Sequence, residues 1–197
     1  MNEALRYAIL ARDSYSLPPD IGCEQSASRA CVTVMDGELI VSIPGTNNLA
    51  CFLADLDCEV RAIAGLGCCH WGFYSAFSDI EEQLMQLSPA VIAAHSLGAA
   101  MGIIYAAKLC LAGRPPKAVY AFEPPRVSID PTIANLFAKH GVKMHLTRFG
   151  EDIVPCIPRL LHSWQHPCDP NAIGVAREPI WNVHDHSIDN VVAYYSA

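Results

Sequence analysis

The hydrophobic positions of this chain follow two different periods along its length. Continuous apolar runs occur at residues 90–94 and 118–122, and a third strand-like run covers residues 142–149. Between them, residues 97–111 and 131–140 have the spacing of helices. Buried parallel strands read as uninterrupted apolar runs, and the helices that connect them carry an apolar face. This alternation predicts an α/β fold with a mainly parallel central sheet flanked by helices.

The rest of the chain is less regular. Asp36-Gly37 favours a two-residue turn, so residues 30–35 and 38–43 are predicted to form a hairpin. Helical spacing predicts a first amphipathic helix in residues 1–16, one or two short helices in 47–64, a longer helix over 73–87 and a last helix in 186–195. Residues 155–179 are rich in proline and predict mostly loop. A chain of 197 residues needs no second domain, so we expect one domain over residues 1–197.

Composition limits the classes of partner. Hydrophobic residues make up 52% of the chain, charged residues 17%, and the formal net charge is −7. Nucleic-acid binders need clustered Lys and Arg to neutralise phosphates, so no nucleic-acid partner is expected. The nine cysteines show no Cys-x-x-Cys pair, which favours a reduced compartment, no disulfide framework and no thiolate metal site.

The start of the chain bears on location. Charged residues interrupt the apolar positions of residues 1–16, unlike those of a signal peptide. No run approaches the roughly 18 apolar residues that a membrane span requires. We therefore expect a cytoplasmic protein, with release by another route left open.

The junction at residues 94–98 carries the first candidate chemistry. Ala94-His95-Ser96-Leu97-Gly98 follows an apolar strand and opens a helix, which is the context of a Gly-x-Ser-x-Gly nucleophile elbow. Such an elbow projects the serine hydroxyl from the carboxyl edge of the sheet and needs small residues on either side. The N–H of Leu97 would then face a developing oxyanion. The alternative is that Ser96 only caps the helix.

A nucleophilic serine needs an acid from later in the chain. Asp152 follows the predicted strand at residues 142–149, at a carboxyl strand end, where ligand chemistry gathers in open α/β sheets. Glu151 is its rival, and Glu123, after the preceding strand, is a third candidate. Asp152 is the best-placed acid, although a turn residue or helix cap would explain it too.

The base must be one of four C-terminal histidines, His162, His166, His184 or His186. His186 stands just before the last predicted helix, so a loop there could present it to the sheet edge. His184-Asp185-His186 could also suggest a metal site, but no further ligands are suitably spaced. We therefore expect His186 as the base, and neither a metal nor a cofactor.

Several separated segments together resemble the class 3 lipases, the fungal triacylglycerol lipases and their bacterial relatives with an α/β-hydrolase fold. In chain order these are Ile43-Pro44-Gly45-Thr46, Phe52-Leu53-Ala54-Asp55-Leu56, His70-Trp71-Gly72-Phe73, the serine elbow, Phe122-Glu123-Pro124-Pro125-Arg126-Val127, Gly150-Glu151-Asp152-Ile153-Val154-Pro155 and Asp185-His186-Ser187. The resemblance covers most of the chain. Its departures are Ala94 and Glu123-Pro124 in place of glycine-containing positions, and Phe52 where the family usually has tryptophan.

The resemblance implies a role for each matching residue. Ser96 would be the nucleophile, Asp152 the acid and His186 the base, with Thr46 as a second oxyanion donor opposite Leu97. A lid would comprise Asn47, Asn48, Leu49, Ala50, Cys51 and Phe52, unless that segment is packed permanently on the core. The short interval between Asp152 and His186 implies trimmed C-terminal loops and a smaller or more open acyl pocket.

The implied function is that of a serine hydrolase, a lipase or esterase that cleaves carboxylic esters through an acyl-enzyme and without a cofactor. The substrate would be an acyl ester or lipid, with transient contact to a lipid interface and no stable protein partner. A phospholipase or acyltransferase would use the same triad. A catalytically silent lipase-like binding module is the alternative from another class.

Overall fold

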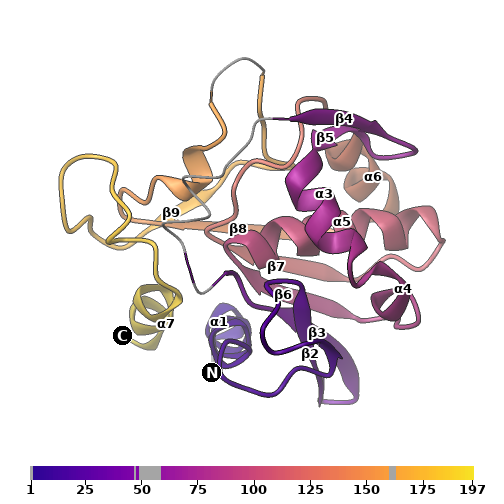
Figure 1. Cartoon of the computed structure of the whole chain (residues 1–197). Helices are drawn as coiled ribbons and strands as arrows, with labels where there is room; N and C mark the ends of the chain where they lie inside the picture. Colours follow the sequence, from indigo (N-terminus) through magenta and orange to yellow (C-terminus); the bar gives the residue numbers. More distant parts are fainter. Residues whose placement is uncertain (1, 47, 49–58, 160–162) are drawn as a thin grey trace.

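The computed structural model of the chain describes residues 2–46, 48, 59–159 and 163–197. Its seven-stranded sheet has the order β1-β2-β3-β6-β7-β8-β9 (Figure 1). The strands are β1 (Ile21–Gly22), β2 (Arg29–Met35), β3 (Glu38–Ile43), β6 (Val91–His95), β7 (Ala118–Phe122), β8 (Lys143–Phe149) and β9 (Asn171–Ile173). From β3 to β9 neighbouring strands are parallel, and only β1 and β2 add antiparallel pairs. This sheet confirms the predicted α/β architecture.

Helices cover both faces of the sheet. On one face lie α1 (Glu3–Asp13) and α7 (Ile188–Ser196), which pack side by side. On the other lie α3 (Trp71–Ser78), α4 (Glu81–Leu84), α5 (Leu97–Leu111) and α6 (Thr132–His140). A single turn of 3-10 helix, η1, spans Val154–Cys156. The first and last predicted helices are therefore confirmed, and the two ends of the chain meet on the same face of the sheet.

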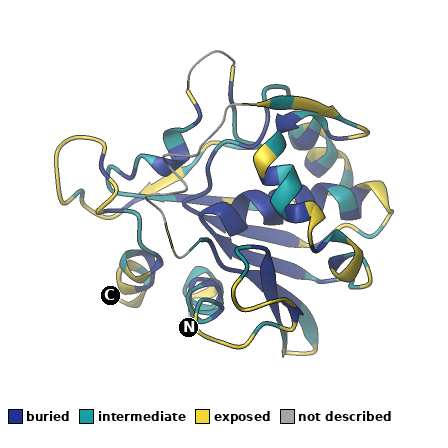
Figure 2. Cartoon of the chain, viewed as in Figure 1, coloured by how far each residue is buried: buried dark blue, intermediate teal, exposed yellow. Residues whose placement is uncertain are grey.

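The apolar runs are buried because every side chain of the central strands meets a helix. Along β6, Val91 and Ala93 belong to the core under α1 and α7, whereas Ile92 and Ala94 belong to the core under α5. Complete burial of a side chain such as Ile92 contributes about 1.5–3 kcal/mol. In Figure 2 the inner strands and most of α5 are buried, which matches the apolar residues of α5 on all sides.

The predicted hairpin is confirmed. Strands β2 and β3 pair antiparallel in a register that places Met35 opposite Glu38. Asp36 and Gly37 connect them with φ values of 55° and 78°. Two successive positive φ angles are the geometry of the tight hairpin turn that an Asp-Gly pair favours.

One helix prediction was wrong, and another was wrong over the residues that the structure describes. Residues 60–63, expected to be helical, form strand β4 (Val60–Ile63), which pairs antiparallel with β5 (Gly67–His70), and residues 49–58 lie outside the described part. The helix expected over residues 73–87 is two helices, because the chain turns after Ser78 and buries Ile80 in the core. In short segments, tertiary contacts of this kind determine the secondary structure more strongly than the spacing of apolar residues does.

The described part of the proline-rich segment is mostly loop, as predicted, with one short strand added. Within residues 155–179, expected to be mostly loop, β9 adds a short parallel strand beside β8. It extends the sheet beyond the strand that leads to Asp152. The sequence of β9 has no strand-like apolar run. Its pairing with β8 therefore accounts for its extended conformation.

Candidate active site

Ser96 occupies a strained turn between β6 and α5. Its φ of 58° and ψ of −128° are values that residues other than glycine rarely adopt. A Cβ at Gly98 would lie 2.3 Å from the carbonyl oxygen of Pro44, so no larger residue fits there. Ala94 fits where the family pattern has glycine because Gly102 faces it: a Cβ at Gly102 would lie 3.3 Å from that of Ala94. The extra methyl group fills space that Gly102 leaves open.

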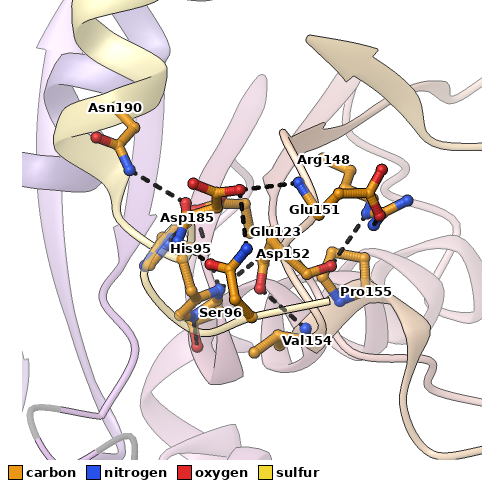
Figure 3. A network of polar contacts seen from close by, with 12 residues as sticks. His95, Ser96, Glu123, Arg148, Glu151, Asp152, Val154, Pro155, Asp185 and Asn190 are labelled. Atoms are coloured by element: carbon orange, nitrogen blue, oxygen red, sulfur yellow. Dashed lines mark hydrogen bonds and ion pairs between the residues drawn. The ribbon is translucent and has the colours of Figure 1, made fainter. Parts of the chain in front are cut away.

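The three residues predicted as a triad form a continuous hydrogen-bond chain. The Nε2 atom of His186 lies 2.8 Å from Ser96 Oγ, and its Nδ1 atom lies 2.7 Å from Asp152 Oδ2. Asp152 is fully buried, and its Oδ1 accepts a hydrogen bond from the N–H of Val154 at 2.9 Å. An ionised Asp152 accepts only, so Nδ1 of His186 carries the proton and Nε2 accepts from the serine hydroxyl. Figure 3 shows Ser96, Asp152 and their neighbours gathered at this edge of the sheet.

A buried carboxylate, Asp185, fixes the loop that carries His186. It accepts hydrogen bonds from the backbone N–H of Glu151 at 2.9 Å, from that of Arg177 at 3.1 Å and from the side chain of Asn182 at 3.2 Å. Burial alone would raise the pKa of Asp185, but these hydrogen bonds lower it below its ordinary value. The sequence indicated Asp185 only as part of a possible metal pattern and of a segment that resembles the family, and gave no sign of this role.

The rival acids and bases lie elsewhere. The carboxylate of Glu151 pairs with Arg148 at 2.6 Å. His184 is exposed to solvent, and His166 donates a hydrogen bond to a backbone carbonyl while burial lowers its pKa to about 4. His162 lies outside the described residues. Of the candidates that the structure describes, it brings only Asp152 and His186 into a hydrogen-bond chain with Ser96.

Next to the hydrogen-bond chain of Ser96, His186 and Asp152 lies a second polar chain, which the sequence did not predict. Glu123 is fully buried with a φ of 54°, and its Oε2 lies 2.8 Å from Nε2 of His95. Nδ1 of His95 lies 2.6 Å from the hydroxyl of Tyr15, which accepts the N–H of Gly45 at 2.8 Å. The ring of His95 stacks on that of His186 with centroids 4.8 Å apart. Two features of the sequence could have indicated this second chain. One is His95 inside the elbow, and the other is Glu123 where the family pattern has a glycine-containing turn.

Charge balance in this second chain is set by burial. Desolvation, and next the neighbouring His186, lower the pKa of His95 well below its ordinary value, so this ring is neutral. Desolvation, and next the charge of Asp152, raise the pKa of Glu123 well above its ordinary value. Burial also raises the pKa of Tyr15. All three groups are therefore driven toward their uncharged forms.

The segment before the predicted lid lies against Ser96. A Cβ at Gly45 would lie 2.7 Å from that of Ser96, so this backbone passes directly beside the serine. Thr46 follows, with its Oγ1 accepting the N–H of Asn48 at 3.1 Å, and Leu97 is the first residue of α5. Of the predicted lid, Asn48 is exposed, and Asn47 and residues 49–52 lie outside the described part.

A cavity of about 320 Å³ opens beside Ser96. Its walls come from the end of α1, the elbow, Thr46 and the start of α7: Arg12, Tyr15, Thr46, His95, Ser96, His186, Ser187, Ile188 and Asp189. The side chains that line the cavity next to the serine hydroxyl are mostly polar, and Ile188 of α7 adds an apolar side chain to the wall.

A comparison with protein families identifies the chain. The model of the lipase (class 3) family matches residues 40–162, which is more than half of the sequence. The chain belongs to the class 3 lipase family. This membership confirms the resemblance carried by the separated motifs, and with it the α/β-hydrolase fold.

Three similar proteins from fungi illustrate the relationship. A secreted mono- and diacylglycerol lipase of Malassezia globosa is 29% identical over 170 residues, which cover 74% of this chain and 55% of that protein. The chain therefore spans about half the length of this curated relative. Among solved structures, a Rhizopus microsporus lipase matches at 18% identity and TM-score 0.69, covering 91% of this chain and 75% of that one. A Rhizomucor miehei lipase with its propeptide matches at 22% identity and TM-score 0.63, covering 80% and 63%.

The prediction of a cytoplasmic protein was wrong, because the curated relative of this chain is a secreted lipase. The apolar positions of residues 1–16 are explained by the fold, because Tyr7, Ala8 and Ala11 of α1 pack on the sheet. They give no information about the location of the protein. In the described residues, no helix combines the length and the apolar character that crossing a membrane demands.

One cluster of described residues has the donor types of a metal site. Ligand atoms of His95, Glu123 and His186 lie within 4.8 Å of one another. Hydrogen bonds already join His95 to Glu123 and His186 to Asp152. A metal ion would have to break both bonds and would remove the proton acceptor of Ser96. The expectation of neither metal nor cofactor stays a prediction.

Proposed function

We propose that this class 3 lipase hydrolyses carboxylic esters of lipids, with Ser96 as nucleophile, His186 as base and Asp152 as the acid that orients it. The observation that carries the proposal is the hydrogen-bond chain from Asp152 through His186 to a serine on a strained elbow. A helix cap needs no histidine at its hydroxyl, and Ser96 makes no side-chain capping bond to α5. Residues 1–197 would act as one domain.

In the proposed mechanism, Nε2 of His186 takes the Ser96 proton as Oγ attacks the ester carbonyl. Asp152 holds the imidazole in the required tautomer and stabilises its cationic form. The proton then passes to the leaving alkoxide, which departs as the alcohol. Water attacks the acyl-enzyme by the same route, which releases the carboxylic acid and restores the serine.

Two backbone N–H groups would stabilise the tetrahedral oxyanion. Leu97 is the first residue of α5, where the N–H has no partner inside the helix and the helix dipole is positive. Thr46 lines the same cavity, on the segment that passes against Ser96. Each such donor contributes about 10²–10³-fold to the rate.

For the substrate we propose an acylglycerol or a similar lipid ester, met in transient contact with a lipid surface. Support comes from the Malassezia relative, which is a mono- and diacylglycerol lipase. Hydrolysis of p-nitrophenyl esters of increasing chain length, below and above their solubility limits, tests this proposal. A rise in rate above the limit is expected, and a lipase-like enzyme that prefers dissolved esters would contradict it.

The nucleophile is tested with Ser96→Ala and with Ser78→Ala as a matched control on the exposed end of α3. Loss of the nucleophile should reduce p-nitrophenyl butyrate hydrolysis by about 10⁴–10⁶-fold without unfolding the protein. A fluorophosphonate probe should label the parent chain and Ser78→Ala but leave Ser96→Ala unlabelled. Full activity or labelling of Ser96→Ala would refute the proposal and favour another nucleophile.

A further inference from the structure

The second polar chain joins the two ends of the proposed machinery. It begins at the N–H of Gly45, next to Thr46, and passes through the Tyr15 hydroxyl and the His95 ring to the carboxyl group of Glu123. Glu123 in turn lies beside the acid end of the triad, since its Oε2 is 4.0 Å from Nδ1 of His186. No step of the proposed hydrolysis uses these groups.

The hydrogen bonds of this chain determine where its protons lie. The Tyr15 oxygen accepts the N–H of Gly45, so its own O–H can donate to Nδ1 of His95. The neutral His95 ring then carries its proton on Nε2 and donates it to Oε2 of Glu123. Glu123 is required only to accept at this oxygen, which a carboxylic acid can do as well as a carboxylate.

The other oxygen of Glu123 decides between the two forms. Oε1 is buried and has no hydrogen-bond partner in the described part of the chain at the distances of an ordinary bond. A buried carboxylate oxygen without a donor is costly, whereas a hydroxyl at this position has the neighbouring Asp152 carboxylate as its acceptor. Burial first, and then the charge of Asp152, raise the pKa of Glu123 and favour its protonated form, while the nearby backbone of Phe149 acts in the opposite direction.

Titratable groups from several elements surround Glu123, and burial keeps two of them, His95 and Tyr15, uncharged. The groups that face Glu123 are His95 from β6, Tyr15 after α1, Asp152 after β8, and Asp185 and His186 from the loop before α7. Nδ1 of His186 lies 2.7 Å from Asp152 Oδ2 and 4.0 Å from Glu123 Oε2. A second anion at Glu123 would therefore hold His186 as the cation and prevent it from accepting the serine proton.

We propose that Glu123 is a positioning residue that works as a neutral carboxylic acid. Through Oε2 it holds the uncharged His95 ring flat against His186, and it leaves Asp152 as the single anion beside the imidazole. The neutral ring lets His186 become charged during the reaction without facing another cation. This role rests on the proposed ester hydrolysis, because it concerns the base of that reaction.

The test compares Glu123→Gln with Glu123→Met. Glutamine keeps an oxygen for His95 and offers an N–H group to Asp152, as the protonated acid does. Methionine has a similar size but neither group. Both variants keep an unbranched side chain at the φ of 54°, so backbone strain is equal. Glu82→Gln, on an exposed face of α4, controls for the loss of one negative charge.

The readout is the pH dependence of kcat/KM for p-nitrophenyl butyrate. Glu123→Gln should retain activity within about threefold, with the midpoint of the acidic limb unchanged, because no charge is removed. Glu123→Met should lose about 10–100-fold in kcat/KM, because His95 and His186 are no longer held in place. If Glu123→Met does not fold, Tyr15→Phe, which breaks the same chain at its other end, replaces it.

Three results would overturn the proposal. A shift of the acidic limb in Glu123→Gln to lower pH, by about one unit, would mean that Glu123 is an anion in the parent chain. Activity of Glu123→Gln as low as that of Glu123→Met would mean that a neutral side chain cannot replace it. Full activity of Glu123→Met would remove the positioning role.

The failure of the proposed function can be told apart from the failure of this inference. If the parent chain hydrolyses no ester, the titration of the His186 ring is followed by NMR instead. Equal midpoints in the parent chain and Glu123→Gln support the neutral acid, and a lower midpoint in the variant refutes it. Glu82→Gln should match the parent chain in either measurement.

Discussion

Replacing Gly98 by alanine tests whether the close approach of α5 to the segment after β3 holds Ser96 in place. A Cβ at this position would lie 2.3 Å from the carbonyl oxygen of Pro44 and 2.4 Å from that of Ile43. Both are backbone atoms, so neither can rotate away as a side chain could. To restore an ordinary contact of about 3.5 Å, the start of α5 must move by roughly 1 Å.

The size of the effect follows from two opposing contributions. Overpacking of a buried site costs about 1–3 kcal/mol, and a clash with backbone belongs at the upper end. Alanine returns up to about 1 kcal/mol through its better helix propensity. The net loss is about 2 kcal/mol in the free energy of unfolding, or about 4–8 °C in Tm for a chain of this length. Activity should fall by about 10²-fold, because Ser96 and Leu97 move relative to Thr46.

Gly102→Ala is the matched control on the same helix. Its Cβ would meet side-chain atoms, Ile92 Cγ2 at 3.1 Å and Ala94 Cβ at 3.3 Å, which can shift by a few tenths of an ångström. We expect a change within about 1 kcal/mol and activity close to that of the parent chain. Thermal unfolding and p-nitrophenyl butyrate hydrolysis measure both variants. Gly98→Ala with parental stability and activity, or equal damage from both substitutions, would refute the reasoning.

Three further predictions concern the histidines and carboxylates. His186→Ala should abolish ester hydrolysis and the exposed His184→Ala should not; equal kcat values would contradict the proposed base. Asp185→Ala should lower the free energy of unfolding by about 1–3 kcal/mol, because it leaves buried N–H groups unpaired, and urea unfolding measures this loss. The lowered pKa of His95 makes stability fall as pH falls below 6.5, and the raised pKa of Glu123 makes stability fall as pH rises above 4.5. The two effects oppose each other between these values, so Glu123→Gln should lose up to about 1.4 kcal/mol per pH unit on acidification relative to the parent chain; parallel urea-unfolding profiles would contradict it.

Much of the fold follows from local sequence. The apolar runs that became β6 and β7 could be recognised because both faces of these strands are covered, which requires apolar residues at every position. The Asp36-Gly37 turn follows from the positive φ angles that these residue types tolerate. The error at β4 has the converse cause: its four residues carry no decisive period, and pairing with β5 makes them a strand.

The candidate site also has residues that the sequence predicts and residues that it does not. Ser96, Asp152 and His186 were accessible from the sequence, because each stands in a recognisable motif at the end of a predicted strand or before a predicted helix. Their roles stay proposals that the variants above test. Asp185 could not be predicted, since its importance lies in the N–H groups of Glu151 and Arg177, which only the folded loop brings to it.

The sequence by itself determined the alternation of the central strands and helices and the turn that carries Ser96, because these depend on the spacing of apolar residues and on the space each residue occupies next to its neighbours. Only the tertiary structure decided that Tyr15, His95 and Glu123 form one chain beside the triad. Contacts between residues so far apart in sequence leave no periodic trace. Their charge states are set by burial and by neighbouring charges, which exist only once the chain has folded.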